Sequence, residues 1–244
     1  KSEIFQGYNT YTEVAVKVNT DWVVQQFREK TDGGTGAVQA WKEVEKEFLE
    51  QYTKGDAGQA WKSVSGKAFE KAIQLLFHNL IRKDKDSPPL EIKQWKEAAK
   101  IPVVKRILSE HLWVRGEIRE PYLAESQVDF VALALQDDNP YRVVAVYSCK
   151  TSLRERFQQD LFWADRLRSR GIRFGFITLD QDGDFEEVIQ DGEIEKASKS
   201  AKMAMALYDR VYLFYEEGQI RHFSHILRPV DHLLIDLKKW LEAD

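Results

Sequence analysis

The chain of 244 residues contains one cysteine, Cys149, and no long apolar run. A single cysteine excludes an internal disulfide framework and any zinc site built from several cysteines. No apolar segment approaches the roughly 18 to 20 residues that a membrane-spanning helix needs. The amino-terminal segment KSEIFQGYNT lacks the apolar core of a signal peptide. We therefore expect an intracellular, cytoplasmic protein.

Charge of one sign does not dominate the chain, because 36 lysine and arginine residues stand against 40 aspartate and glutamate residues. A hydrophobic content of 43% with 31% charged residues argues against disorder. Between residues 142 and 173, however, eight basic residues stand against three acidic ones. Because salt screens charges beyond about 8 Å, such a segment can hold a phosphate backbone even in an acidic protein. A solvated helix face with charges of both signs explains the same segment.

The hydrophobic pattern changes its period along the chain. In the first third, apolar residues recur at helical spacing, which predicts helices over 20–30, 37–54 and 63–83, with Ser65 as a candidate N-cap. In the centre, two β-branched runs joined by the turn sequence DDNP predict a hairpin of strands, 127–136 and 141–150. The later elements that we expect are a helix over 153–170, a strand over 172–180, helix over 186–209, strands over 210–217 and 218–225, and a helix over 229–243. This order predicts an α/β fold in which a mixed central sheet is flanked by helices, with a helical N-terminal region.

Two ionisable residues mark one edge of the predicted hairpin. Asp129 stands near the start of the first strand, and Lys150 ends the second. In an antiparallel pair with a tight turn, such residues face each other, so we expect the two side chains to meet. An aspartate there can ligate Mg²⁺ while the lysine orients a water for attack on phosphorus. A strand-edge salt bridge explains the same pair.

A magnesium site normally uses more than one carboxylate, and the position that would share the strand face with Lys150 is Ser148. Asp160 lies ten residues beyond Lys150 on the following helix, and Glu70 lies beside the apolar stripe of an earlier helix. Either carboxylate can join the cluster, and either can be an ordinary acid on a helix surface.

These residues belong to two longer segments, Ser65-Gly66-Lys67-Ala68-Phe69-Glu70 and Lys150-Thr151-Ser152-Leu153-Arg154-Glu155-Arg156. With Asp129 and Asp160, they resemble the active site of the PD-(D/E)xK nuclease superfamily, in the variant whose middle acid lies on the next helix. More closely, the chain resembles type II restriction endonucleases that recognise CCGG or CC-N-GG cores. Several of those enzymes carry Ser-Gly-x-Ala-Phe-Glu and Lys-Thr-Ser-x-Arg-(Asp/Glu)-Arg. The resemblance covers roughly residues 60 to 180, with Val128 in place of the proline of the "PD" pair.

The resemblance implies a Mg²⁺-dependent endonuclease that cleaves double-stranded DNA at a palindromic site with a CC/GG core. It implies a PD-(D/E)xK core over 61–244, preceded by a helical region over 1–60 for dimerisation or DNA contacts. The implied catalytic residues are Asp129, Lys150, Asp160 and Glu70, with Asp129 and Asp160 as metal ligands. The family glutamate often stands about 13 residues after the lysine, at Trp163 here, so Asp160 takes its role and Asp165 is the reserve.

Recognition of DNA is expected from the segment that follows Lys150. Arginine donates two hydrogen bonds to guanine and glutamate accepts one from cytosine, so Arg154, Glu155 and Arg156 suit consecutive G·C pairs, with Ser152 beside them. A palindromic target requires two-fold symmetry, which predicts a homodimer. A less specific nuclease acting in DNA repair or RNA processing, a non-catalytic DNA-binding module and a helical interaction protein remain as alternatives.

Overall fold

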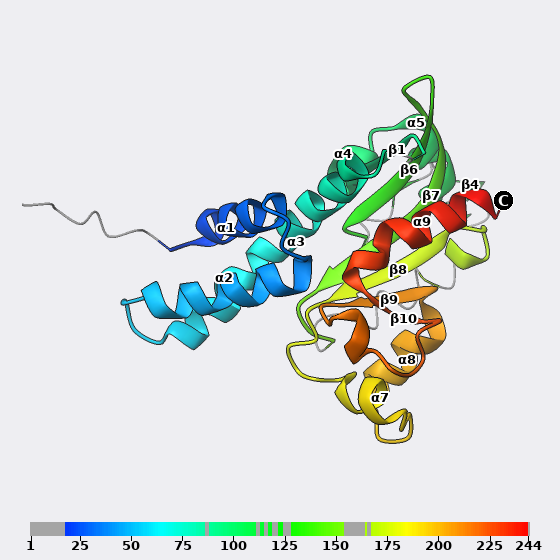
Figure 1. Cartoon of the computed structure of the whole chain (residues 1–244). Helices are drawn as coiled ribbons and strands as arrows, with labels where there is room; N and C mark the ends of the chain where they lie inside the picture. The colour runs from blue at the N-terminus through cyan, green and yellow to red at the C-terminus, as the bar shows by residue number, and fades with distance from the viewer. Residues whose placement is uncertain are drawn as a thin grey trace, which may run out of the picture.

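The centre of the protein is a six-stranded mixed sheet in the order β1-β6-β7-β8-β9-β10 (Figure 1). The computed structural model describes residues 18–85, 88–110, 113–114, 117–118, 122–123, 128–153, 164 and 167–243. The strands of the sheet are β1 (Leu90–Gln94), β6 (Phe130–Gln136), β7 (Asn139–Lys150), β8 (Arg173–Thr178), β9 (Arg210–Leu213) and β10 (Leu227–Pro229). The pairs β1–β6 and β6–β7 are antiparallel, and the pairs from β7 to β10 are parallel. Two short ladders pair β2 (Ser109–Glu110) with β5 (Tyr122–Leu123) and β3 (Trp113–Val114) with β4 (Glu117–Ile118).

Helices cover both faces of this sheet. They are α1 (Thr20–Asp32), α2 (Ala37–Gln51), α3 (Ala57–Lys83), α4 (Trp95–Ala98), α5 (Pro102–Leu108), α7 (Glu186–Asp191), α8 (Lys199–Leu207) and α9 (Leu233–Glu242), with the 3₁₀ helices η1 (Glu217–Gln219) and η2 (Val230–His232). Apolar side chains of α1, α2, α3 and α9 pack against one face of the sheet. Those of α5, α7 and α8 pack against the other face. The predicted α/β architecture is confirmed, and none of the described helices is long and apolar enough to cross a membrane.

Strand β7 is buried on both of its faces. Tyr147 and Cys149 belong to the core beneath α3 and α9, whereas Val146 belongs to the core on the opposite side. Tyr147 stands beside Gly175 of β8 in the parallel register. A Cβ atom at Gly175 would lie 2.6 Å from two ring carbons of Tyr147, so only glycine leaves room for this ring.

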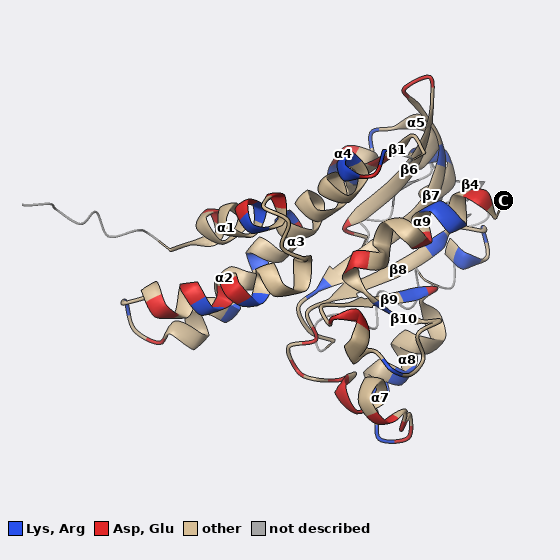
Figure 2. Ribbon diagram, viewed as in Figure 1, with Lys and Arg blue, Asp and Glu red and all other residues tan. Residues whose placement is uncertain are grey.

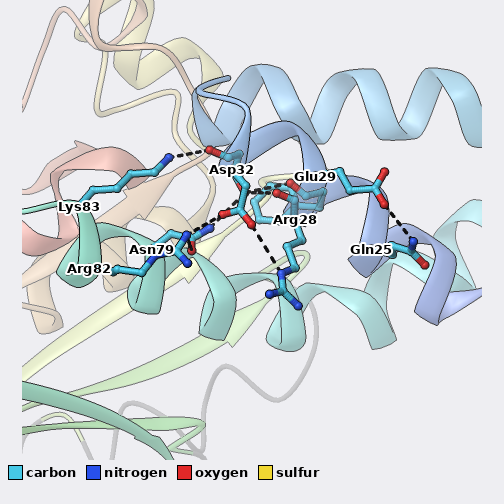
Figure 3. Close-up of polar contacts among 9 residues, drawn as sticks. Gln25, Arg28, Glu29, Asp32, Asn79, Arg82 and Lys83 are labelled. Carbon is cyan, nitrogen blue, oxygen red and sulfur yellow. Dashed lines mark hydrogen bonds and ion pairs between the residues drawn. The ribbon is translucent and has the colours of Figure 1, made fainter.

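Helix α3, with 27 residues, joins the N-terminal helices to the sheet. Its N-cap is Asp56, whose side chain accepts a hydrogen bond from the backbone N–H of Gln59. Figure 3 shows polar contacts between its last turns and α1, among them Arg82 to Asp32 at 3.0 Å. The expected division between 1–60 and 61–244 falls inside this helix, and it remains a prediction.

Three local expectations were wrong. Ser65 is not an N-cap, because α3 already begins at Ala57 and Ser65 is buried inside it. Residues 218–225 form no strand; they contain part of η1 and then irregular backbone. The single helix expected over 186–209 is two helices, α7 and α8, because Gly192 ends α7 in the left-handed conformation.

Candidate active site

Asp129 is held by backbone hydrogen bonds at the point where the chain enters β6. Its N–H donates to the carbonyl oxygen of Tyr147 at 2.8 Å, and its own carbonyl oxygen accepts from the N–H of Trp95 at 2.9 Å. Its carboxylate oxygen Oδ2 accepts from the backbone N–H of Cys149 at 2.6 Å. These bonds to β7 and to the first residue of α4 fix the carboxylate at the end of β7.

Lys150, the last residue of β7, meets this carboxylate. Its Nζ lies 3.1 Å from Asp129 Oδ2, so the predicted contact between the two side chains is confirmed. The side chains are only 16% and 18% exposed, and this shielding makes their attraction stronger than that of a pair in open solvent. In the parallel register, Lys150 stands beside Thr178, the last residue of β8. The pair therefore lies at the carboxyl edge of the parallel strands, where α/β sheets commonly bind ligands.

Glu70 brings a second carboxylate to this place from α3. The residue as a whole is exposed, yet its carboxyl group is partly shielded from water, and this desolvation raises its pKa. The negative charge of Asp129 raises the pKa of Glu70 further, and the positive charges of Lys150 and Lys96 lower it. The electrostatic influence of these groups on Glu70 indicates that α3, β7 and α4 contribute charges to one site.

Gln181 connects α3 to the end of β7. Its backbone N–H donates to the carbonyl oxygen of Thr151 at 3.1 Å. Its side-chain Nε2 donates to Ser65 Oγ at 3.4 Å. Ser65 thus faces the loop that follows Lys150, in which Ser152 is half-buried. This bridge positions the segment around Glu70 against the lysine strand.

Sequence reasoning missed both Gln181 and Lys96. The two residues come from segments far apart along the chain and belong to neither of the recognised motifs. For Gln181 one signal was present, since it follows closely after the apolar run of β8, at the edge where Lys150 also ends its strand. For Lys96 we find no sequence signal.

Other expected site residues, Asp160, Arg154, Glu155, Arg156 and the reserve Asp165, lie outside the described residues. Within the described ranges, no group of three or more histidine, cysteine, aspartate or glutamate side chains could hold a metal ion. Asp129 and Glu70 supply two carboxylates there. Two are compatible with Mg²⁺, which is usually bound through one or two carboxylates while water and phosphate oxygens complete its shell.

The comparisons with known proteins agree with this architecture. A family model described as BsaWI restriction endonuclease type 2 matches residues 100–236, more than half of the chain. This match includes Asp129 and Lys150, and it leaves Glu70 outside. A comparison with curated protein sequences found no match.

The chain was also compared with solved structures. The chain is similar to the restriction endonuclease AgeI in a specific complex with DNA, with 15% identity, a TM-score of 0.51, and coverage of 88% of this chain and 84% of AgeI. It is also similar to BsaWI in a pre-specific complex with DNA, with 14% identity, a TM-score of 0.46, and coverage of 92% of this chain and 94% of BsaWI. The expected restriction-endonuclease core is confirmed. The chain belongs to the BsaWI family of type II restriction endonucleases and is a site-specific DNA nuclease.

Proposed function

We propose that this type II restriction endonuclease acts as a homodimer and uses Mg²⁺ to cleave double-stranded DNA at a palindromic site with a CC/GG core. The observation that carries the proposal is the contact of Lys150 Nζ with Asp129 Oδ2 at the carboxyl edge of the sheet, within the electrostatic reach of Glu70. A lysine and an aspartate at a strand edge, with a glutamate within electrostatic reach, suit the hydrolysis of a phosphodiester. The complex of AgeI with DNA supports the same class of substrate.

Asp129 and Asp160 would ligate the metal, and Glu70 would support it directly or through water. These residues fit a divalent cation by their charge. The carboxylates of Asp129 and Glu70 repel each other, and a bound cation would relieve this repulsion. When bound, Mg²⁺ supplies positive charge to the phosphate and makes a water more acidic. Hydrogen bonds from Cys149 N–H and Lys150 hold the Asp129 carboxylate in one orientation. The carboxylate therefore does not have to reorient during the reaction.

Lys150 would act on the substrate itself. Its ammonium group has three donors, of which one is directed to Asp129. In the complex with DNA, this ammonium group would orient the attacking water and stabilise the negative charge that develops on the scissile phosphate.

Recognition of the target would come from the residues that follow β7. Arg154 and Arg156 would each donate two hydrogen bonds to guanine in the major groove, while Glu155 would accept from cytosine and Ser152 would contact the adjacent bases or backbone. Each bidentate contact would contribute about 1 to 3 kcal/mol of discrimination. The helical region over 1–60 would provide the dimer interface or further contacts with DNA, and the enzyme would act in the cytoplasm of a prokaryotic cell.

The test is a plasmid digest with the purified protein in MgCl₂ and, in parallel, in EDTA. We expect discrete fragments only with Mg²⁺, and the sequences of their ends give the site, the cut position and the overhang. A continuous smear would instead support the less specific nuclease, and binding without any cleavage would support the DNA-binding module.

Substitutions at the charge pair test its role. Lys150→Ala and Asp129→Ala should each abolish cleavage while DNA binding in EDTA stays measurable. The matched control is Arg173→Ala, because Arg173 pairs with Asp209 at the same distance of 3.1 Å but stands at the opposite end of the sheet, at the start of β8. Cleavage that survives Lys150→Ala would remove the proposed active site.

A further inference from the structure

Gly66 is a glycine in the interior of α3, and its packing against the described residues does not require glycine. Glycine in a helix interior costs about 0.8 to 1 kcal/mol relative to alanine. A Cβ atom built at Gly66 meets no atom within 4 Å among the described residues outside its own stretch of helix, and its backbone is not in the left-handed region. Among the described residues, neither packing nor backbone conformation calls for glycine at this position, and a helix without a side chain here leaves room for a partner to approach closely.

The position of Gly66 identifies where that approach takes place. Gly66 stands four residues before Glu70, so the two share one side of α3 about 6 Å apart. Its neighbour Ser65 is joined through Gln181 to Thr151, the residue that follows Lys150. Gly66 is exposed, and it directly follows the residue of α3 that this bridge links to the loop after Lys150.

Two lysines accompany Gly66 on the exposed surface of α3. Lys62 precedes it by one helical turn, and Lys67 follows it directly. Neither lysine takes part in an ion pair with another described residue, whereas Lys71, one turn further along, pairs with Asp21 at 3.0 Å. This surface thus offers two cations beside an open glycine.

The charge distribution favours a polyanion here and disfavours it elsewhere. Blue basic segments occur along α3 in Figure 2, whereas α7 and the loops around it are mainly red. Between residues 180 and 195 the chain has eight acidic residues and no lysine or arginine. A phosphate backbone is attracted to the first surface and repelled by the second.

We propose that the α3 surface formed by Lys62, Gly66 and Lys67 binds the sugar–phosphate backbone of double-stranded DNA, which passes directly over Gly66. This inference rests on the proposed function, because it describes the path that the substrate DNA takes from the candidate active site near Glu70 along α3. Because Gly66 has no side chain, the sugar–phosphate backbone of the DNA can contact the helix there. Lys62 and Lys67 would donate hydrogen bonds to the phosphates on the two sides of this contact. The contact is independent of base sequence, and it sets the position of the duplex relative to Lys150.

The decisive variants are Gly66→Ala and Gly66→Gln, because stability and DNA affinity should change in opposite directions. Both substitutions favour the helix, so we expect each to raise Tm by about 2 to 4 °C. We expect Gly66→Gln to weaken binding of a fluorescein-labelled 30-base-pair duplex in EDTA about tenfold or more, measured by fluorescence anisotropy, with a smaller loss for Gly66→Ala. The control is Gly218→Ala in η1, where an added Cβ atom also meets nothing within 4 Å. It should leave the affinity unchanged.

The lysines have a separate readout in the salt dependence of binding. Lys62→Gln and Lys67→Gln should each reduce the slope of log K against log salt concentration by about 0.9, as expected for one lost phosphate contact. Lys199→Gln on α8, on the opposite face of the sheet, is the control.

The possible failures are distinguishable. If wild-type protein cuts a plasmid into discrete fragments but Gly66→Gln binds DNA as tightly as wild type, the α3 contact is refuted and the proposed function stands. If wild-type protein does not cleave with Mg²⁺, the proposed function fails.

Discussion

Asp180 is a buried carboxyl group that should make the stability of the protein fall as the pH rises. The residue follows β8 closely and is 6% exposed. Its carboxylate accepts from the N–H of Asp184 at 2.8 Å, the N–H of Phe185 at 3.2 Å and the hydroxyl of Tyr215 at 3.2 Å. Burial outweighs these three hydrogen bonds and raises the pKa of Asp180 to about 7.

The direction of the effect follows from this pKa. In the unfolded chain the carboxyl group titrates near 3.8, so between about pH 4 and pH 7 the folded protein binds more protons than the unfolded one. The free energy of unfolding therefore decreases as the pH rises through that window, which is the opposite of the usual behaviour of an aspartate in a salt bridge. Integration of the two titration curves gives a loss of about 2 to 3 kcal/mol between pH 5 and pH 8.

The substitution Asp180→Asn removes this titration while keeping the size of the side chain. We would measure urea unfolding of wild type and Asp180→Asn at pH 5, 6, 7 and 8, and plot the difference in unfolding free energy between the two. Contributions of other ionisable groups cancel in this difference, which should shift by about 2 to 3 kcal/mol in favour of the variant as the pH rises. A difference that stays constant over these pH values would refute the argument.

Two further predictions concern the packing of the sheet. Gly175→Ala should lower the free energy of unfolding by about 1 to 3 kcal/mol, because the new Cβ atom would overlap the ring of Tyr147, and urea unfolding with no loss would contradict the close approach. Asp236→Ala should lower it by about 3 to 5 kcal/mol in the same assay, because Asp236 is 1% exposed and pairs with Arg228 at 3.2 Å and Arg210 at 3.6 Å. A decrease in unfolding free energy of less than about 1 kcal/mol would show that the ion pairs of Asp236 with Arg210 and Arg228 do not stabilise the fold.

The central hairpin could be predicted because its pattern is local. Two apolar runs flank a four-residue turn sequence, and the structure has β6 and β7 joined there, with Asp137 and Asp138 in the left-handed conformation. Antiparallel pairing then brings Asp129 and Lys150 together without further information, and their contact is confirmed. The order of helices and strands predicted the architecture for the same reason.

Features that depend on distant segments could not be predicted. Strand β1 is short and half-polar, and it becomes a strand by pairing with β6. Ser65 is a good N-cap by type, yet α3 continues through it because Asp56 caps the helix two turns earlier and Trp61 is buried in the core. The link from Ser65 through Gln181 joins residues 116 positions apart, and no sequence pattern records such a contact.

The close packing of the Tyr147 ring against Gly175 helps to set the register of β7 against β8, and with it the position of Lys150. Because both faces of β7 are apolar, alternation of polar and apolar side chains cannot fix its register against β8. A slip of one residue would set Tyr147 beside Phe174 or Phe176, each of which has a bulky side chain in place of the hydrogen of Gly175. Exchanges among the aliphatic residues of β7 and β8 should therefore leave the register, and with it the position of the Lys150 ammonium group, unchanged. Replacement of Gly175 by a larger residue would remove the space for the Tyr147 ring. The present register would then no longer be favoured over one in which β7 is shifted by one residue, about 3.3 Å, along β8.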